Sequence, residues 1–364
     1  MTDYKIRAYD AAGTLQYELV DFQSLSYRKA VNEAGLGKFV LNGEHPLVTD
    51  IEDKWQIEFW RRNQGQGIDW ACDFYGLFRE PDREGAGPGT FTALCPGQLS
   101  ILGWPIVAWP AGTANRSQFN AVPAETIMKT LVDYNAGGNA TAGNGRVRTW
   151  AINGWTIGII ADSGGGNVLD WYCAYDNLLA TLQDIGSVAG GDFDLVQIDT
   201  NKWEFRWYDG QLGTDRTTTV MFAVELGNMA RPRFRQRRLN ERTVAIVAGQ
   251  GEGSERDIAV RTGGNYSTTN EIEMLVDARN VAAGNSGGLN TRGDQALFEK
   301  RATDEFDFDV LQVPSTLYGL HYFLGDLVTV RSPYTGSDVT RKIRAVTVGV
   351  DTNGEQIGVE MVDV

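Results

Sequence analysis

Histidine and cysteine side chains, which supply most nucleophilic, acid–base and metal-binding chemistry, are scarce in this sequence. The 364 residues include two histidines, His45 and His321, and three cysteines, Cys72, Cys95 and Cys173. The cysteines are odd in number and widely spaced, so they form neither a CxxC zinc pair nor a disulfide framework. The histidines lack an HExxH or nucleophile-elbow context. We therefore expect no catalytic residues, no metal and no cofactor, and interpret these side chains as packed or surface groups.

Two glycine-rich stretches could cradle a phosphate. Residues 164–166 are Gly-Gly-Gly, and residues 249–253 read Gly-Gln-Gly-Glu-Gly. Neither carries the Lys-Ser/Thr of a P-loop. The second precedes strand-like residues 254–260, so no helix N-terminus would hold a pyrophosphate there. We interpret this second stretch as a hairpin turn.

Arginines concentrate in one short run of an otherwise acidic chain, at Arg231, Arg233, Arg235, Arg237, Arg238 and Arg242. Guanidinium groups suit ion pairs with carboxylates across a subunit or domain interface. A solvated face and a nucleic-acid contact are the alternatives. Only Phe234 is interleaved as a stacking partner for bases, which disfavours nucleic acid. We favour an interface.

Carboxylates alternate with apolar residues in residues 304–310. In a strand, Phe306 and Phe308 would face one way, while Glu305, Asp307 and Asp309 would face the other. Alternate carboxylates of a straight strand lie about 7 Å apart, too far to share one calcium ion easily. A hydrolase would have only these carboxylates as candidates, and no cleft is marked for them. The remaining interpretations are a plain polar face and a carboxylate-lined lumen to which DNA does not adhere.

Aromatic residues offer a further possibility. Among ten tryptophans, Trp104, Trp109, Trp150 and Trp155 lie near expected loops and could line a sugar-binding groove. Aromatic residues in β proteins more often belong to cores or interfaces. A carbohydrate-binding protein that recognises a host therefore stands as the alternative function.

Composition restricts the classes of protein further. Hydrophobic residues make up 42% and charged residues 22%, as in soluble globular proteins, and the formal net charge is -14. Such a charge repels nucleic-acid phosphates overall. No apolar run approaches the roughly 18 to 20 residues of a membrane span, so we expect no membrane insertion. The first residues lack the pattern of a secretory signal, which predicts synthesis in a cytoplasm.

Strand patterns dominate the elements that must position these groups. Residues 53–95 and residues 325–362 each read as three strands joined by turns, and Asn353-Gly354 is a strong hairpin signal. The similar spacing predicts a duplicated plan. Helices are expected at residues 123–132, from Asp176 to residue 185, and at residues 292–302. Strands are expected at residues 147–160 and 193–208.

The sequence resembles the siphophage tail-hub proteins, which include baseplate hubs and the N-terminal modules of tail-associated lysins. The N-terminal likeness lies in residues 4–10, 22–29, 32–41 and 55–61. The C-terminal likeness is more specific and extends over about 120 residues. Its motif residues, expected to be structural, are Arg256, Glu271, Asp277, Arg292, Gly293, Gly325 and Asp326.

The resemblance implies a mainly β (α+β) fold with two tube-like antiparallel β-barrel domains. Residues 1–111 would form the first barrel, and residues 233–249 with 298–364 the second. Residues 112–232 would form a middle α+β domain, and residues 250–297 a small inserted β region.

The resemblance also implies a function. Tail hubs are trimers whose pseudo-sixfold ring docks on the hexameric tail tube. The expected partners are therefore two further copies, tail-tube or distal-tail ring proteins, and tail-tip or fibre proteins. Phage DNA would pass through the channel without specific binding. The expected location is the virion tail tip, assembled in the host cytoplasm.

Overall fold

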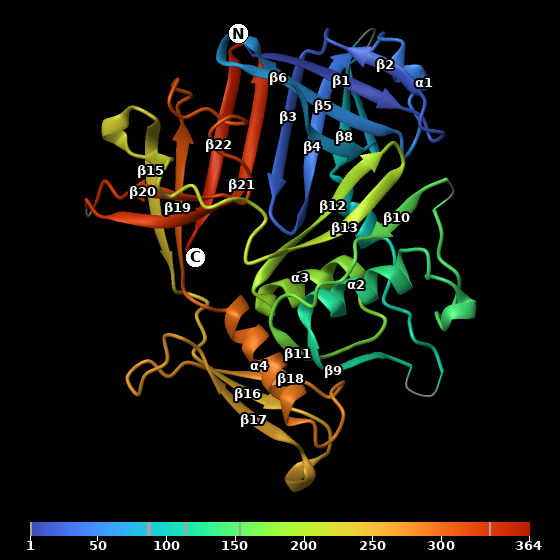
Figure 1. The fold of residues 1–364 in the computed structure, drawn as a ribbon, viewed down its shortest axis with the longest axis vertical. Helices are drawn as coiled ribbons and strands as arrows, with labels where there is room; N and C mark the ends of the chain where they lie inside the picture. Colours follow the sequence, from blue (N-terminus) through green and yellow to red (C-terminus); the bar gives the residue numbers. More distant parts are fainter. Residues whose placement is uncertain (1, 86–88, 113–114, 153, 335) are drawn as a thin grey trace.

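The computed structural model describes residues 2–85, 89–112, 115–152, 154–334 and 336–364, and the fold is mainly β with a few helices (Figure 1). Within these residues, ten strands form one large sheet in the order β15-β19-β22-β21-β3-β4-β8-β7, with β20 on β21 and β14 on β20. Its strands are β3 (Ser24–Ala30), β4 (Glu33–Asn42), β7 (Glu80–Glu84), β8 (Thr90–Pro96), β14 (Met221–Phe222), β15 (Met229–Arg237), β19 (Thr303–Val310), β20 (Leu327–Arg331), β21 (Asp338–Asp351) and β22 (Gly354–Val362).

The large sheet contains two blocks of four strands with the same topology. The C-terminal block is β15-β19-β22-β21, and the N-terminal block is β3-β4-β8-β7. When the four strands of a block are numbered by their order along the chain, both blocks have the order first, second, fourth, third across the sheet. All neighbours within each block are antiparallel. The blocks meet where β21 pairs antiparallel with β3, from Ala345 opposite Ala30 to Val350 opposite Leu25.

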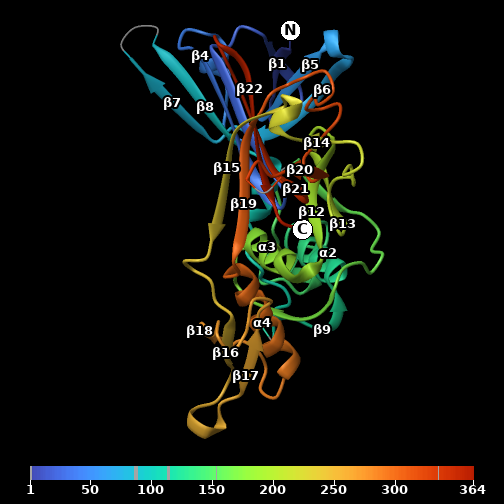
Figure 2. The ribbon, with the colours of Figure 1, turned by 90° about the vertical axis from the view of Figure 1, so that its left-hand side faces the viewer.

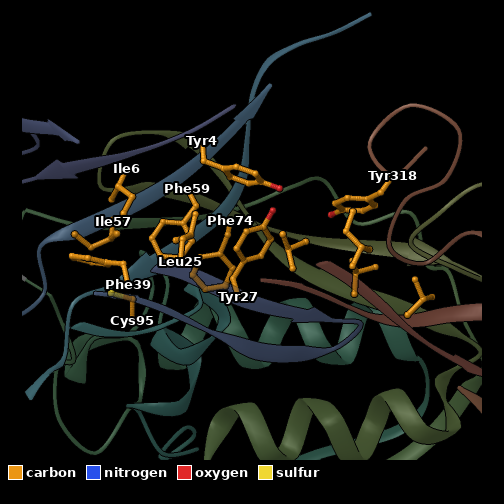
Figure 3. Packing of buried hydrophobic residues seen from close by; sticks show 14 of the residues in the cluster. Tyr4, Ile6, Leu25, Tyr27, Phe39, Ile57, Phe59, Phe74, Cys95 and Tyr318 are labelled. Atoms are coloured by element: carbon orange, nitrogen blue, oxygen red, sulfur yellow. The ribbon is translucent and has the colours of Figure 1, made fainter. Parts of the chain in front are cut away.

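A smaller sheet covers the inner face of the large one. It has the order β2-β1-β5-β6, with β1 (Asp3–Tyr9), β2 (Leu15–Leu19), β5 (Gln56–Asn63) and β6 (Ile68–Leu77); the short helix α1 (Leu47–Asp50) follows β4. Ile6, Ile57 and Phe59 from the smaller sheet pack against Phe39 and Leu25 from the large sheet (Figure 3). The same core contains Phe306, Val346 and Val359 from the C-terminal block. Alternation of apolar and polar residues drives this packing, because each strand buries one face.

Residues between the two blocks form a second core around two helices. The helices are α2 (Ala124–Asn135) and α3 (Leu178–Ala189), and the strands are β9 (Ser117–Pro123), β10 (Thr156–Ile159), β11 (Val168–Cys173), β12 (Gly191–Asp199) and β13 (Lys202–Asp209). The β12–β13 hairpin extends from these helices toward the two larger sheets (Figure 1).

A third, small core lies at the end of the molecule away from the N-terminus (Figure 1). Here β17 (Ile258–Thr262), β16 (Val244–Ala248) and β18 (Glu273–Asp277) form a three-stranded sheet beneath α4 (Ser286–Glu299). The chain enters this part after β15 and leaves it into β19. Among the described residues, no helix is long and apolar enough to cross a membrane.

Most predicted elements are present, with shifts that local hydrogen bonds explain. The side chain of Asn177, rather than Asp176, caps α3 by accepting from the Ala180 N–H at 3.1 Å. Helix α4 begins before Arg292, because Asn285 accepts from the Gly288 N–H at 2.8 Å.

The predicted strand over 147–160 is wrong for the described residues except for β10, and residue 153 lies outside the described residues. The loop that precedes β10 is held by Arg146, which donates to the Arg148 and Ile106 carbonyls at 2.8 and 3.0 Å. The predicted plan of strands is present at both ends of the chain, as β20, β21 and β22 and as β5, β6–β7 and β8. In the N-terminal case, however, the middle strand breaks after Leu77, so β6 belongs to the smaller sheet and β7 to the large one.

Candidate interaction surface on the large sheet

The outer face of the large sheet carries the two charge runs that the sequence marks. Strand register places alternate residues of every strand on this face, opposite the buried core. From one edge to the other it presents Arg233, Arg235 and Arg237 on β15, Glu305 and Asp307 on β19, Glu360 on β22, Thr347 on β21, Ser26 and Arg28 on β3, Leu36 and Lys38 on β4, Thr92 and Leu94 on β8, and Glu80, Asp82 and Glu84 on β7.

The arginine run and the acidic run pair with each other. Strands β15 and β19 are antiparallel neighbours, with Arg235 opposite Glu305 and Arg233 opposite Asp307. Arg237 forms an ion pair with Glu305 at 2.6 Å, and Arg235 forms one with Asp307. Beyond a bulge at residues 231 and 232, Arg231 pairs with Asp309. The three carboxylates are therefore compensated by guanidinium groups within the chain.

Ion pairs continue across the junction of the two blocks. Arg28 on β3 contacts Glu360 on β22 at 3.0 Å and Glu33 on β4 at 2.9 Å. Glu33 also accepts from Arg344 on β21 at 2.9 Å. Burial raises the pKa of Glu33, but Arg28 and Arg344 outweigh it, so that the pKa lies below its ordinary value.

A hollow of about 320 Å³ lies between these charges. Its lining includes Arg235 and Arg237 on β15, Arg344 on β21, and, on the strands between them, Glu305, Asp307 and Glu360. Because the three arginines and three carboxylates balance, the hollow has no net charge that would attract a phosphate or a cation.

The other arginines of the run differ in their surroundings. Arg233 has no side-chain partner within the described chain. Arg238 reaches Glu241 only at 4.0 Å, and Arg242 donates to the Glu241 carbonyl at 2.7 Å. Arg231 is the most exposed of the paired ones, with 85% of its side chain accessible.

Two of the family-motif residues form a turn that joins distant parts of the chain. Gly325 has a φ of 84°, which favours glycine, and a Cβ there would lie 2.7 Å from the Gly213 nitrogen. Asp326 is 2% exposed and accepts from Thr214 N–H at 2.7 Å, Arg216 Nε at 2.8 Å and Phe323 N–H at 2.8 Å. This carboxylate fixes the 213–216 loop beside β20.

The remaining motif residues belong to the small third core. Arg256 donates to the Gly249 carbonyl at 3.1 Å, which closes the glycine-rich turn. Arg279 holds the pKa of Asp277 low, at about 2. Gly293 lets α4 approach the sheet, since a Cβ would lie 2.8 Å from Val247 Cγ2. Two further residues play smaller parts: Arg292 lies over the Trp171 ring at 5.5 Å, and Glu271 accepts from Tyr266 at 3.5 Å.

Histidines and cysteines occupy structural positions. His45 Nδ1 accepts from the Leu47 N–H, and His321 Nδ1 accepts from the Leu317 N–H at 2.9 Å. Burial raises the pKa of Cys72 and Cys95, which keeps these thiols protonated. Within the described ranges, no group of three or more His, Cys, Asp or Glu side chains is placed to hold a metal ion.

Several tryptophans pack on other aromatic rings. Trp104 stacks on Trp155 with centroids 6.0 Å apart, and Trp109 stacks on Tyr134 at 4.2 Å. Trp150 and Trp155 line a hollow of about 270 Å³ beside Trp203.

Comparison with known proteins places this geometry in a family. A family model described as Siphovirus ReqiPepy6 Gp37-like protein matches residues 5–362. The chain belongs to this family. The sequence-based assignment to siphophage tail proteins is thereby confirmed. No curated protein matches the sequence.

Solved structures share the fold over almost the whole chain. The 43 kDa tail protein of prophage MuSo2 from Shewanella oneidensis has a TM-score of 0.59 at 13% identity, covering 99% of this chain and 98% of that one. The tail protein from Neisseria meningitidis MC58 has a TM-score of 0.59 at 11% identity, covering 99% and 97%. The prophage tail protein gp18 from Listeria monocytogenes EGD-e has a TM-score of 0.54 at 12% identity, covering 98% and 94%. The fold is thus one that phage tail proteins have.

A polar network inside the main core was missed by sequence reasoning. Asp73 accepts from Tyr318 at 2.8 Å and also from Tyr27 and Lys29. Figure 3 shows the hydroxyl groups of Tyr27 and Tyr318 directed into the space between these two residues of the core. Burial would raise the pKa of Asp73, but Lys29 and the two hydroxyl donors lower it below its ordinary value.

A second polar contact ties the two ends of the chain together. Arg61 on β5 pairs with Glu355 on β22 at 2.8 Å and donates to the Tyr318 carbonyl at 3.0 Å. Tyr4 on β1 also contacts Glu355. No local pattern marks these residues, because their partners lie far apart in the sequence.

Proposed function

We propose that this protein is the structural hub of a phage tail tip, without a catalytic role. In this proposal three copies form a homotrimer with pseudo-sixfold symmetry that docks on the hexameric tail tube and encloses the DNA channel. The two blocks of identical strand order in one sheet carry the proposal. A threefold assembly of such chains repeats the block six times, which matches a hexameric neighbour.

In such a hub, the two blocks would be the main parts of the tube-like domains predicted for residues 1–111 and for residues 233–249 with 298–364, although β15 begins earlier, at Met229, and β16 belongs to the small third sheet. The middle domain of residues 112–232 and the inserted region of residues 250–297 would lie outside the tube. The core that both blocks share supports a rigid ring segment, since their strands bury apolar side chains in common.

We propose that the outer face of the large sheet, with Glu305, Asp307 and Asp309, lines the channel. Because Arg231, Arg235 and Arg237 compensate these carboxylates, the face is close to neutral and salt-bridged. A neutral wall has no row of free cationic side chains that could displace the counterions of the DNA phosphates. DNA would therefore slide past without adhering. The overall charge of -14 adds a weak repulsion.

The six arginines of residues 231–242 form the proposed interface region. Arg233, which has no side-chain partner among the described residues, and the exposed Arg231 and Arg238 are the groups available to another subunit or ring. The proposed partners are two further copies, the tail-tube or distal-tail ring proteins, and tail-tip or fibre proteins. The proposed location is the virion tail tip.

Cryo-electron microscopy of the assembled particle tests this function. We expect density for three copies at the tail tip, six similar blocks around the channel, and Glu305 facing the DNA path. Density for this chain on the outside of the tail, or in a number other than three, would overturn the proposal.

Carbohydrate binding is the second candidate function, favoured by the hollow that Trp150 and Trp155 line. A glycan array would show binding that is lost in Trp155→Ala. Trp104→Ala would act through the stacked Trp155, whereas Trp109→Ala would leave binding intact, since Trp109 stacks elsewhere. Absence of any glycan signal for the intact chain would remove this candidate.

A further inference from the structure

The eight-strand path of the large sheet, from β15 to β7, ends in two open edges. In the described chain, β7 pairs only with β8 and β15 only with β19. All five residues of β7 are exposed, and Figure 2 shows the β7–β8 hairpin projecting from the body of the molecule. An exposed edge strand is a ready template for another strand unless it is covered in the assembly.

The two edges carry opposite charge on the same face. On β7, the outer-face residues Glu80, Asp82 and Glu84 have no ion-pair partner within the described residues. On β15, the outer-face residues are Arg233, Arg235 and Arg237. Each edge therefore presents three like charges at every second position, and the signs are complementary. On β15, Arg235 and Arg237 also pair with Asp307 and Glu305, so Arg233 is the arginine without a partner among the described residues.

The chain already contains a junction of the same kind. Strand β21 is the last strand, in space, of the C-terminal block, and it pairs antiparallel with β3, the first strand of the N-terminal block. In the shared topology, β7 is the last strand of the N-terminal block, as β21 is of the C-terminal block. Likewise, β15 is the first strand of its block, as β3 is of the N-terminal block. Alternation of antiparallel neighbours along the sheet also makes β7 and β15 run in opposite directions.

We propose that β7 of one copy docks beside β15 of the next copy, with Glu80, Asp82 and Glu84 facing Arg233, Arg235 and Arg237. This inference rests on the proposed trimer and names the surface that joins its copies. The contact is head-to-tail, so three copies related by rotation close into a ring. Each external junction then repeats the internal β21–β3 junction.

Side chains, rather than a full ladder of backbone hydrogen bonds, carry the specificity of this contact. Pro81 lies within β7 and Pro232 lies at the bulge of β15, and proline removes an N–H from each edge. Such prolines suit edges that must not pair with arbitrary strands. Cross-strand pairs of opposite charge, screened by salt, then select the partner.

Sedimentation velocity of the full chain at increasing concentrations tests the proposal, at about 50 mM and about 1 M salt. The test variant is Glu80→Lys/Asp82→Lys/Glu84→Lys, because these carboxylates have no ion-pair partner among the residues that the structure describes. The matched control is Glu252→Lys/Glu255→Lys/Glu273→Lys, which changes the net charge equally on exposed residues of the small third core. Thermal unfolding of both verifies that they fold.

We expect the wild-type chain and the control to form a trimer, and the β7 variant to associate roughly tenfold or more weakly at low salt, since lysines would then face the arginines of β15 and the contact would become repulsive. Arg233→Glu alone should weaken association severalfold. Combining it with the β7 variant should restore part of the loss.

Two results would overturn the inference. A trimer that is insensitive to the β7 substitutions would show that other surfaces join the copies, while the hub function would stand. A wild-type chain that stays monomeric at every concentration would show that these edges do not join copies by themselves. The hub function would then be decided separately by the copy number in the assembled particle.

Discussion

Asp194 on β12 is an acid held where its neutral form is favoured. Burial raises the pKa of Asp194 to about 6, against an ordinary value of 3.8, although Leu195 N–H, Lys29 and Arg206 act in the opposite direction. Among the described residues, its carboxylate accepts one hydrogen bond, from the Leu195 N–H at 2.8 Å. Between about pH 4 and pH 6 the folded chain binds more protons here than the unfolded chain. This contribution to stability is therefore present at low pH and is lost as pH rises through 6.

Asp194→Asn should raise the free energy of unfolding at pH 7.5 by about 2 kcal/mol, because the amide removes the buried charge. The gain should vanish near pH 4. Urea unfolding at both pH values measures it. Asp69→Asn is the matched control, since Asp69 accepts from its own following N–H at 2.7 Å but is exposed. An equal effect of both substitutions would contradict the burial argument.

Asp326 is the opposite case, a buried carboxylate with every partner in place. Asp326→Asn keeps its shape but puts an amide NH₂ against backbone N–H groups and leaves Arg216 unpaired. We expect a loss of about 3 kcal/mol in urea unfolding. Asp338→Asn, which breaks the exposed pair with Arg331, should cost less than about 1 kcal/mol. A small loss at Asp326 would mean that the 213–216 loop is held by other contacts.

At the scale of elements, the large sheet needs glycine on one face and tolerates it on the other. A Cβ on Gly37 of β4 would lie 2.5 Å from Phe74 Cε1 and 2.8 Å from Phe59 Cε2, where the rings are buried. A Cβ added to Gly349 on β21 would have no other atom within 4 Å.

Gly37→Ala should therefore lower the free energy of unfolding by about 2 kcal/mol, because the two rings must move within a packed core. Gly349→Ala should leave it unchanged or raise it by up to about 1 kcal/mol, since alanine restricts the unfolded chain. Denaturant unfolding of the two variants side by side gives the comparison. Equal losses would show that strand propensity, not packing, decides the cost.

Sequence patterns predicted elements well where their signals are local. The hairpin of β21 and β22 follows from Asn353 and Gly354, and α2 and α3 follow from their apolar periodicity. The partners of these elements could not be predicted, because the pairing of β21 with β3 joins residues more than 300 positions apart, from Ala345 opposite Ala30 to Val350 opposite Leu25. No local pattern records such a register.

The charge ladder illustrates the same limit for the candidate site. Both runs were identified as notable, yet their pairing across 72 positions, as in Arg235 and Asp307, needs the register of β15 against β19. The outer-face carboxylates of β7 gave no signal, since Glu80, Asp82 and Glu84 are ordinary residues until β7 is known to be an edge.

At the scale of the molecule, the two blocks share one core and one sheet. We therefore expect them to unfold together. Val348→Ala on β21, a fully buried residue opposite Tyr27 of β3, should cost about 2 kcal/mol. In hydrogen exchange, this loss should lower the protection of β4 and β8 as much as that of β22. Protection that falls only in β21 and β22 would show that the blocks are independent units.

The pairing of β21 with β3 also has a consequence during synthesis. A ribosome adds about 5 to 20 residues per second, so β3 is exposed for roughly 15 to 60 s before β21 is made. During that interval β3 pairs with β4 along one edge, while its other edge, where β21 will later pair, has no partner strand. Nascent chains are then vulnerable to aggregation, and fragments that stop before β21 would keep an unpaired edge for proteases and chaperones to recognise. The edge of β3 is therefore covered only in copies whose synthesis has reached β21.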